Sequence, residues 1–237
     1  VVARGPLGAL SVFAERRTAV MLALGFAAGL PNLLIFDTLS AWLRASGLSL
    51  ELISFFSLAT LAYSFKFLWA PLIDRTAVPI LTGWLGHRRS WMLVAQGAIA
   101  VGLLLVAGSN PKANLPLMAL FAVFTGFSSA TQDIVIDAWR IEAADVARQG
   151  AMAAAYQWGY RIAIMVAGAV PLLLADSFGW NLSYGLMAAL MGVGVAAVLL
   201  APREQAHVIR AIPVGGVKQA PALEGAEWAL RLGLLLI

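Results

Sequence analysis

The chain of 237 residues contains no cysteine and few charged side chains. Without cysteine it has no disulfide framework, no thiolate metal site and no thiol nucleophile. Charged residues make up 12% of the sequence, whereas a soluble globular domain carries about 25%. Hydrophobic residues make up 61%, and the mean hydropathy is +0.86. Too few polar side chains are present to cover a water-facing surface, so the composition indicates a membrane protein.

Histidine is also scarce, which weighs against an enzyme or a metal site. His87 and His207 both fall in expected loops, and neither has a partner at ligand spacing. The sequence has no H-E-x-x-H, no G-x-S-x-G and no phosphate-binding glycine loop. A hydrolase working inside the membrane could use buried aspartates, but it would not need Lys66 and Arg161 at comparable depth. We therefore expect no enzyme, no metal and no cofactor.

The net charge of +4 does not indicate a nucleic-acid partner. Lys and Arg do not form a stripe interleaved with aromatic residues, as a nucleic-acid surface would require. They separate the apolar segments instead, which is typical of membrane topology signals. The expected surroundings are a lipid bilayer, with no nucleic acid.

Apolar runs of about 20 residues, long enough to cross a bilayer as helices, occur six times. Residues 1–17 would precede a six-span bundle over residues 18–201, followed by a linker over residues 202–227. The run 228–237 is too short to cross, so it is interpreted as a surface helix or as the start of a truncated seventh span. No cleavable signal peptide is evident in residues 1–17. The all-α fold is predicted to have spans at residues 18–43, 53–73, 91–107, 115–138, 151–175 and 182–201.

The basic residues of the expected loops orient this bundle. The side that holds the N-terminus, the second and fourth loops and the linker carries eleven Lys or Arg residues, from Arg4 to Lys218. The opposite side carries Arg44 and Lys112. Positively charged loops stay in the cytoplasm, so we predict a cytoplasmic N-terminus and linker.

Six spans, a basic linker and a new apolar run resemble the layout of the major facilitator superfamily. That resemblance implies two six-span halves, each built of two inverted three-span repeats, with the C-terminal half-bundle lying beyond this sequence. At an offset of 97 residues, Gly29 matches Gly126 and Tyr63 matches Tyr160. In a chain this rich in Gly and Ala, such matches are no better than noise.

The loop between spans two and three carries a gating signal. It begins with Asp74 and Arg75 and ends with Gly86, His87, Arg88 and Arg89. The superfamily has a signature of the form G-x-x-x-D-R-x-G-R-R here, in which the acid pairs with Arg to stabilise the outward-open state. This chain has Ala70 in place of the first glycine, and ten residues separate Arg75 from Gly86. Ordinary positive-inside charge is the alternative for Arg88 and Arg89, but it does not explain Asp74.

A longer set of motifs follows the predicted spans in order. They are GFAAGLP at residues 25–31, YSFKFLWAPLIDR at 63–75, GHRRSW at 86–91, SSATQDIVIDAW at 128–139 and GYR at 159–161. Together these strings resemble the AmpG family of muropeptide permeases, related to the acetyl-coenzyme A transporters. The resemblance implies proton-dependent import of anhydromuropeptides across a bacterial inner membrane, driven by the proton gradient without a cofactor. Asp37 departs from the pattern, because a small or uncharged residue is expected there.

Five ionisable residues fall inside the predicted spans, where a charge is costly and usually has a task. They are Asp37, Lys66, Asp133, Asp137 and Arg161. By the helical rise, Lys66, Asp133 and Arg161 lie between the midplane and the cytoplasmic side. Asp133 and Asp137 are four residues apart and share one helical face. These residues predict a polar pathway, whereas Asp37 is interpreted as a solvated charge near the outer end of span one.

Each of these charges has a functional and a structural interpretation. Asp133 is a proton-coupling carboxylate or a permanently ionised partner of Lys66 or Arg161. Asp137 is a second coupling carboxylate or a structural partner of Arg140, three residues on. Arg161 holds an anionic substrate through its guanidinium fork, or it neutralises Asp133. Lys66 supports the substrate site or extends towards the cytoplasmic interface.

Four polar residues near these charges complete the predicted substrate site: Tyr63, Gln132, Gln157 and Tyr160. The substrate itself is known only through the resemblance. A carrier of another anionic solute, such as an acyl-coenzyme A or a peptide, and a non-transporting scaffold or receptor are the alternatives. A second six-span half in the intact gene would distinguish a transporter from a scaffold.

Overall fold

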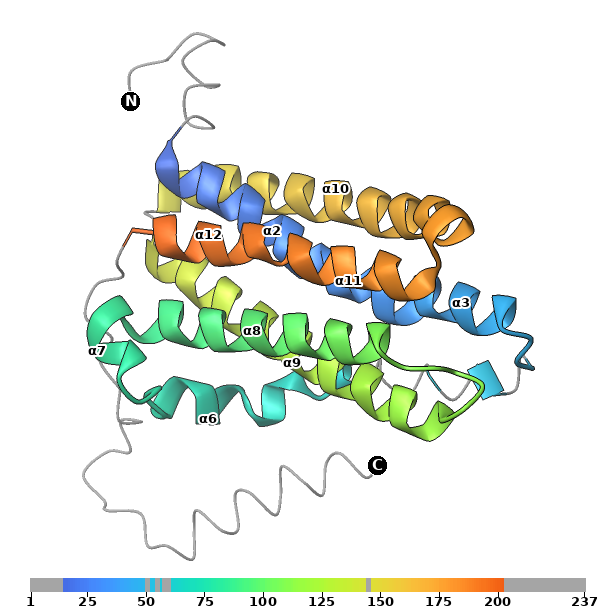
Figure 1. Cartoon of the computed structure of the whole chain (residues 1–237). Helices are drawn as coiled ribbons and strands as arrows, with labels where there is room; N and C mark the ends of the chain where they lie inside the picture. The colour runs from blue at the N-terminus through green and yellow to red at the C-terminus, as the bar shows by residue number, and fades with distance from the viewer. Residues whose placement is uncertain (1–14, 50–51, 54–55, 57–60, 144–145, 203–237) are drawn as a thin grey trace, which may run out of the picture. The chain divides into compact units, whose positions relative to one another are not determined.

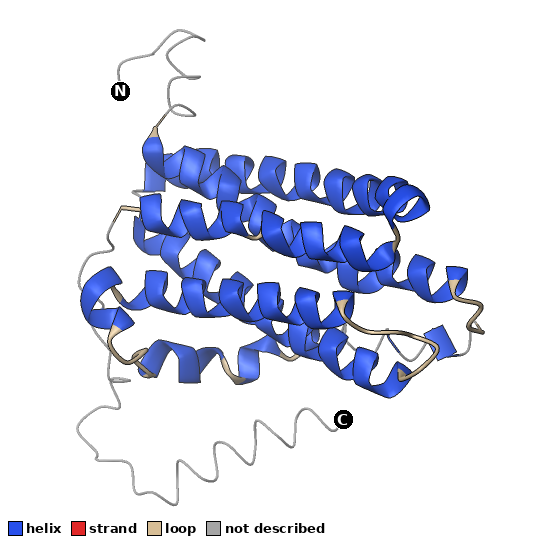
Figure 2. Ribbon diagram, viewed as in Figure 1, coloured by secondary structure: helices blue, strands red, loops and turns tan. Residues whose placement is uncertain are grey.

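The computed structural model describes residues 15–49, 52–53, 56, 61–143 and 146–202 as a bundle of helices (Figures 1 and 2). The described residues form no strand, so the predicted all-α fold is confirmed. In chain order the elements are α2 (Arg16–Leu33), η2 (Leu34–Thr38), α3 (Leu39–Ala45), α5 (Leu61–Ser64), η4 (Lys66–Leu68), α6 (Ala70–Arg75), α7 (Leu81–Leu85), α8 (His87–Ala107), α9 (Leu115–Ala143), α10 (Val146–Phe178), α11 (Trp180–Leu190) and α12 (Gly192–Leu200).

Within the described residues, five helical segments are long and apolar enough to cross a membrane, and they coincide with predicted spans one, three, four, five and six. Several extend beyond the apolar limits read from the sequence: α8 begins at His87 and α10 ends at Phe178. Helical hydrogen bonding continues into the polar interface, whereas hydropathy marks only the part in hydrocarbon. The chain is therefore a multi-pass membrane protein. The five segments are Arg16–Ala45, His87–Ala107, Leu115–Ala143, Ala147–Phe178 and Trp180–Leu200.

The second predicted span, residues 53–73, is interrupted in its second half. There α5 gives way to the 3-10 turn η4 and then to α6. Phe65 and Trp69 have φ/ψ angles of −96°/5° and −102°/−3°, away from α-helical values. Pro71, in the first turn of α6, has no N–H to donate to the preceding turn. The expectation of one continuous helix is wrong over residues 61–73, because apolarity does not report these local breaks.

Span one bends through a π-helical segment. Pro31 lies inside α2, and η2 begins three residues later. Proline removes a helical N–H donor, and a π-helical turn is one way in which a helix takes up such a change. The hydroxyl group of Tyr184 donates to the carbonyl of Leu34 at 2.7 Å. The hydroxyl of Thr38 donates to the carbonyl of Ala167 at 2.9 Å, so η2 is tied to both α11 and α10.

Helices α2 and α10 pack against each other through glycine, side by side as Figure 1 shows. A Cβ atom added at Gly25 would lie 2.9 Å from the carbonyl carbon of Tyr156, and one added at Gly29 would lie 2.6 Å from the carbonyl oxygen of Tyr160. On the opposite surface, a Cβ at Gly159 would lie 2.9 Å from the nitrogen of Phe26. Hydrogen-only side chains let the two backbones approach, as in other membrane helix pairs.

Two apolar clusters fill the bundle, one towards each end. One surrounds Trp42, whose ring stacks on that of Trp180 at a centroid separation of 6.0 Å. The other includes Met21, Met92 and Trp139, and Tyr156 and Tyr160 pack against it. Three predicted segments lie largely outside the described residues: the N-terminal segment 1–17 except its last three residues, the linker 202–227 except its first residue, and the final run 228–237. Their assignments stay predictions.

Candidate functional site

Asp133 lies on α9 where side chains from α5, η4 and α10 meet. Its carboxylate lies within electrostatic range of Lys66 on η4 and interacts with the hydroxyl group of Tyr156 on α10. Tyr63 on α5 and Tyr160 on α10 are within electrostatic range of the same carboxylate. We call these five residues the Asp133 cluster. Predicted site residues that are up to 97 positions apart in the sequence are thus brought together.

Buried polar atoms around Asp133 lack hydrogen-bond partners among the described residues. They include the Tyr63 hydroxyl, the Ser129 hydroxyl, both ends of the Gln132 carboxamide and Oδ1 of Asp133. Gln132 and Ser129 are completely buried. The Tyr63 hydroxyl is directed towards Ser129 and Asn32 without reaching hydrogen-bond geometry. Unpaired polar groups inside a membrane protein are costly, so this concentration makes the region the candidate site for a proton or a solute.

Lys66 and Asp133 attract each other without forming a closed ion pair. The ion pairs with N–O distances within 4.0 Å, as far as the described residues go, involve Arg side chains and leave Lys66 out. Lys66 is half-buried on η4, and its charge faces the Asp133 cluster. The predicted tight Lys66–Asp133 pair is therefore replaced by a longer-range interaction.

Asp137 and Arg140 form the pair that their i, i+3 spacing predicts. Nη2 of Arg140 lies 3.5 Å from Oδ1 of Asp137, and the Asp137 side chain is 53% exposed. The structural interpretation of Asp137 thus has direct support, although Asp137 also acts electrostatically on Asp133. A solvated pair of this kind contributes little stability by itself.

Arg161 and Gln157 lie on a different face from the Asp133 cluster. Both are exposed on α10, next to Trp158, which is 63% exposed. The electrostatic partners of Asp133 in the described structure are Lys66, Asp137 and nearby tyrosines, so the interpretation of Arg161 as its neutralising partner has no support. Depth along a helix gives no information on which side of that helix a residue faces. The predicted role of Arg161 in holding a substrate stays open.

Two of the four predicted gating residues, Asp74 and Arg88, form an ion-pair network with Glu142 at the end of the bundle where α6, α8 and α9 meet. Arg88 is buried and contacts Asp74 through Nη1, while its Nη2 lies 2.8 Å from Oε1 of Glu142. The imidazole Nε2 of His87 lies 2.9 Å from the carbonyl oxygen of Ile73. The signature acid therefore pairs with an arginine, and the ten intervening residues, which include α7, do not prevent it.

The other two gating residues behave differently. Arg89 donates to the carbonyls of Val198 and Leu199 at 2.9 and 3.0 Å, which satisfies acceptors at the end of α12. Arg75 is exposed in the last turn of α6. Arg89 thus holds α12 against α8, a role that positive-inside charge alone does not predict.

Several residues of these two sites escaped the sequence analysis. Tyr156 and Glu142 are not among the site residues that the sequence predicts. A signal for Tyr156 existed, because Tyr156 and Tyr160 are four residues apart and share one face. Asn32 and Ser129 gave no signal beyond being polar inside apolar runs. The described residues also contain no group of three or more His, Asp or Glu side chains able to hold a metal ion.

Comparison with known proteins gives one family match. The family model described as Major Facilitator Superfamily matches residues 45–236. That match covers most of the chain, including the segment that carries the Asp133 cluster and the ion-pair network.

Individual relatives give a narrower likeness. The chain is 43% identical over 194 residues to the anhydromuropeptide permease of Escherichia coli strain K12, which is 81% of this chain and 39% of that protein. It is 34% identical over 190 residues to "Putative transporter AmpG 4" of Rickettsia felis, covering 79% of this chain and 46% of that protein. The resemblance to AmpG permeases is confirmed, and the chain spans less than half the length of these relatives.

Proposed function

Because the chain belongs to the major facilitator superfamily, we propose that it forms the N-terminal half of a secondary transporter that imports anhydromuropeptides across a bacterial inner membrane. The support for the solute is the likeness to the anhydromuropeptide permease of Escherichia coli. The driving force in this proposal is the proton gradient. A second six-span half would supply the other wall of the substrate cavity. The support for such a half is that the aligned part covers only 39% and 46% of the two relatives.

The observation that carries this proposal is the Asp133 cluster. A carboxylate, an ammonium group and three phenols converge from four helical elements in the interior of a membrane bundle. Ionisable residues at such depth are usually part of a proton or substrate pathway. In the proposal Asp133 takes up the coupling proton, because its carboxylate lies inside the bundle within electrostatic range of Lys66. Asp137, one turn away, passes the proton between Asp133 and the cytoplasm.

In the proposal the substrate extends from the Asp133 cluster to the separate, exposed face of α10 that carries Arg161 and Gln157. Arg161 and Gln157, both exposed on α10, would bind its carboxylate groups, because a guanidinium fork matches that geometry. Lys66 adds a second positive charge, and Tyr63, Tyr160 and Gln132 offer hydrogen bonds to sugar and peptide groups. The unpaired carboxamide of Gln132 is suited to this task, since it has both a donor and an acceptor to offer.

The network of Asp74, Arg88 and Glu142 would act as the cytoplasmic gate. In the proposal it closes the inner end of the pathway, with Arg75 and Arg89 beside it, and it opens when the two halves of the transporter separate. A charge network with discrete partners suits this role, because it is either closed or open and not gradually deformed.

The test is transport by the full-length protein. The accumulation of radiolabelled anhydromuropeptide inside inner-membrane vesicles should be measured with and without an imposed proton gradient. We expect saturable uptake that a protonophore abolishes. Saturable uptake of labelled acyl-coenzyme A or free peptide, with no uptake of muropeptide, would assign another solute. Binding without any uptake would contradict the transporter and favour a receptor.

A further inference from the structure

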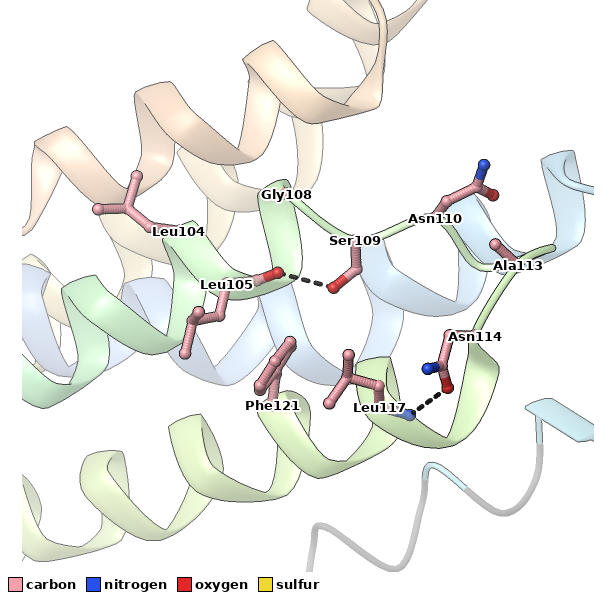
Figure 3. Close-up of a pocket in the computed structure, with 9 residues that line it drawn as sticks. All are labelled: Leu104, Leu105, Gly108, Ser109, Asn110, Ala113, Asn114, Leu117 and Phe121. Atoms are coloured by element: carbon pink, nitrogen blue, oxygen red, sulfur yellow. Dashed lines mark hydrogen bonds between the residues drawn. The ribbon is translucent and has the colours of Figure 1, made fainter.

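A cavity of about 290 Å³ opens where α8 ends and α9 begins, away from the Asp133 cluster (Figure 3). Its walls are apolar on the side of the helices: Leu104 and Leu105 from the last turns of α8, and Leu117 and Phe121 from the first turns of α9. Leu104 is 53% exposed and Leu105 40% exposed. In a membrane protein, exposed leucines of this kind face lipid chains.

The loop side of the same cavity is polar. Ser109, Asn110 and Asn114 line it, as Figure 3 shows. The Asn110 carboxamide oxygen accepts from the backbone N–H of Lys112 at 3.0 Å, and the Asn114 oxygen accepts from that of Leu117 at 3.2 Å. With their oxygens engaged in this way, each carboxamide presents its Nδ2 group as a donor. The cavity is therefore graded from apolar in the helices to hydrogen-bond donating at the loop.

A positive charge stands beside this polar end. Lys112 is exposed on the same loop and is joined through its backbone to the side chain of Asn110. Lys112 lies on the side of the membrane that has few basic residues, which the loop charges predict to be periplasmic. An ammonium group and two amide donors above an apolar slot match a ligand with a phosphate joined to a hydrocarbon chain.

We propose that this cavity binds one phospholipid, with part of an acyl chain against Leu104, Leu105, Leu117 and Phe121 and the phosphate near Lys112. The cavity is at the lower end of the volume range for ligand pockets, so it suits a length of acyl chain better than a disaccharide-peptide. The lining is apolar between the helices and polar at the loop, which is the order of acyl chain and phosphate in a lipid along the membrane normal. The site is separate from the proposed transport pathway and goes beyond the transport function.

Gly108 offers a way to close the cavity without straining the backbone. It lines the cavity and has φ −78°, which any residue adopts. A Cβ added there would lie 3.5 Å from the carbonyl oxygen of Leu104, an ordinary contact. Gly108→Phe therefore places a ring in the cavity. Gly97 is the matched control, because it lies exposed on the same helix with nothing within 4 Å of an added Cβ, and it does not line the cavity.

The experiment uses the full-length protein in nanodiscs that contain phosphatidylglycerol with a photoreactive acyl chain. After illumination, labelled peptides are mapped by mass spectrometry. We expect the label to concentrate on residues 104–121 in the parent and in Gly97→Phe, and to fall about fivefold or more there in Gly108→Phe. Thermal unfolding of each variant checks that the fold is kept. Equal labelling of Gly108→Phe and the parent, or labelling spread over all exposed apolar faces, would show only the surrounding bilayer and overturn the proposal.

The phosphate contact is tested with Lys112→Gln and with a photoreactive diacylglycerol that has the same chains but no phosphate. A lysine near a membrane surface contributes an attraction that corresponds to about fivefold in binding. We expect the parent to prefer the phospholipid over the diacylglycerol by that factor, and Lys112→Gln to lose the preference. If the parent labels equally with both lipids, the cavity binds a hydrocarbon chain alone and the phospholipid assignment is wrong.

Discussion

Arg88 donates to a single carboxylate oxygen of Glu142 from two of its nitrogens, Nε at 3.1 Å and Nη2 at 2.8 Å. The two partners differ in burial: the side chain of Arg88 is 6% exposed and that of Glu142 is 31% exposed. Asp74, the other partner of Arg88, is 48% exposed. Removing the carboxylates should therefore cost more stability than removing Arg88, because the exposed carboxylates can be hydrated when the arginine is absent.

This asymmetry predicts the order of two stability losses. In Asp74→Asn with Glu142→Gln, the buried guanidinium group keeps its charge and loses these two counter-charges, which should cost about 2 kcal/mol, less than for a fully buried pair. Arg88→Met should cost less, since the two carboxylates then face water. Thermal unfolding in detergent measures both losses. The control is Arg75→Gln, next to Asp74 at the end of α6, which should change the stability little. A larger loss in Arg88→Met would contradict the asymmetry.

The second prediction concerns two glycines on α10. Gly159→Ala should destabilise the bundle by about 1–3 kcal/mol, because the added methyl group meets the backbone of Leu22 and Phe26 on α2. Gly150→Ala is the matched control on the same helix, since nothing lies within 4 Å of its added Cβ. Alanine is the better helix former, so this variant should be unchanged or more stable by up to about 1 kcal/mol. Equal unfolding temperatures for both variants would show that the close approach is relaxed in solution.

The third prediction addresses the coupling proton. In the full-length protein, Asp133→Asn should abolish gradient-driven accumulation of muropeptide while some exchange of substrate across the membrane remains, because an amide cannot take up and release a proton. Uptake and counterflow in vesicles separate these two activities. Asp176→Asn, at an exposed position near the outer end of α10, should behave like the parent. Accumulation at the parental level in Asp133→Asn would make this aspartate structural.

The fourth prediction concerns substrate affinity. Arg161→Ala should raise KM for muropeptide ten- to about a hundredfold, the loss expected for hydrogen bonds to a charged group. Arg161→Lys should recover only part of it, because an ammonium group lacks the planar fork. Arg44→Ala, which removes an exposed arginine in the last turn of α3, should leave KM unchanged. If Arg161→Lys and the parent had the same KM, charge alone would account for the role of this residue.

The fifth prediction is the orientation of the chain. Reporter domains fused after Leu48 and after Lys112 should be active on the periplasmic side, and one fused after Val217 on the cytoplasmic side. A phosphatase and a fluorescent protein, active on opposite sides of the membrane, give paired readouts. A periplasmic reading at Val217 would reverse the predicted topology.

Much of the helical architecture could be predicted from the sequence because apolar length is a direct consequence of bilayer thickness. The five long helices all appear where hydropathy places them. The break at Phe65 and Trp69 could not be predicted, since it depends on backbone angles in a run that remains apolar throughout. The π-helical segment η2 is a similar case: Pro31 signals a disturbance, but not its form.

The candidate site shows a different limit. Intramembrane charge identified Lys66 and Asp133, which the fold does bring together. Arg161 was equally conspicuous in the sequence, yet it lies on another face of its helix. The charge of a residue and its depth in the membrane can be read from the sequence. Which other residues its side chain approaches depends on the rotation of each helix about its axis. That rotation is set by small contacts, such as those of Gly25 and Gly159, which carry no chemical signature of a site.

The glycine contacts between α2 and α10 also restrict how this half can move. Gly25 faces the backbone of Tyr156 and Gly29 that of Tyr160, so a shift along the helix axes by less than one turn, about 5.4 Å, would force backbone atoms together. Sliding of one helix past the other is therefore sterically opposed, so we expect the two helices to move together and to carry Tyr156 and Tyr160 with them. The short pieces α5, η4 and α6 contain no glycine that packs in this way. The separation between Lys66 and Asp133 is thus the internal distance that we expect to change during a transport cycle.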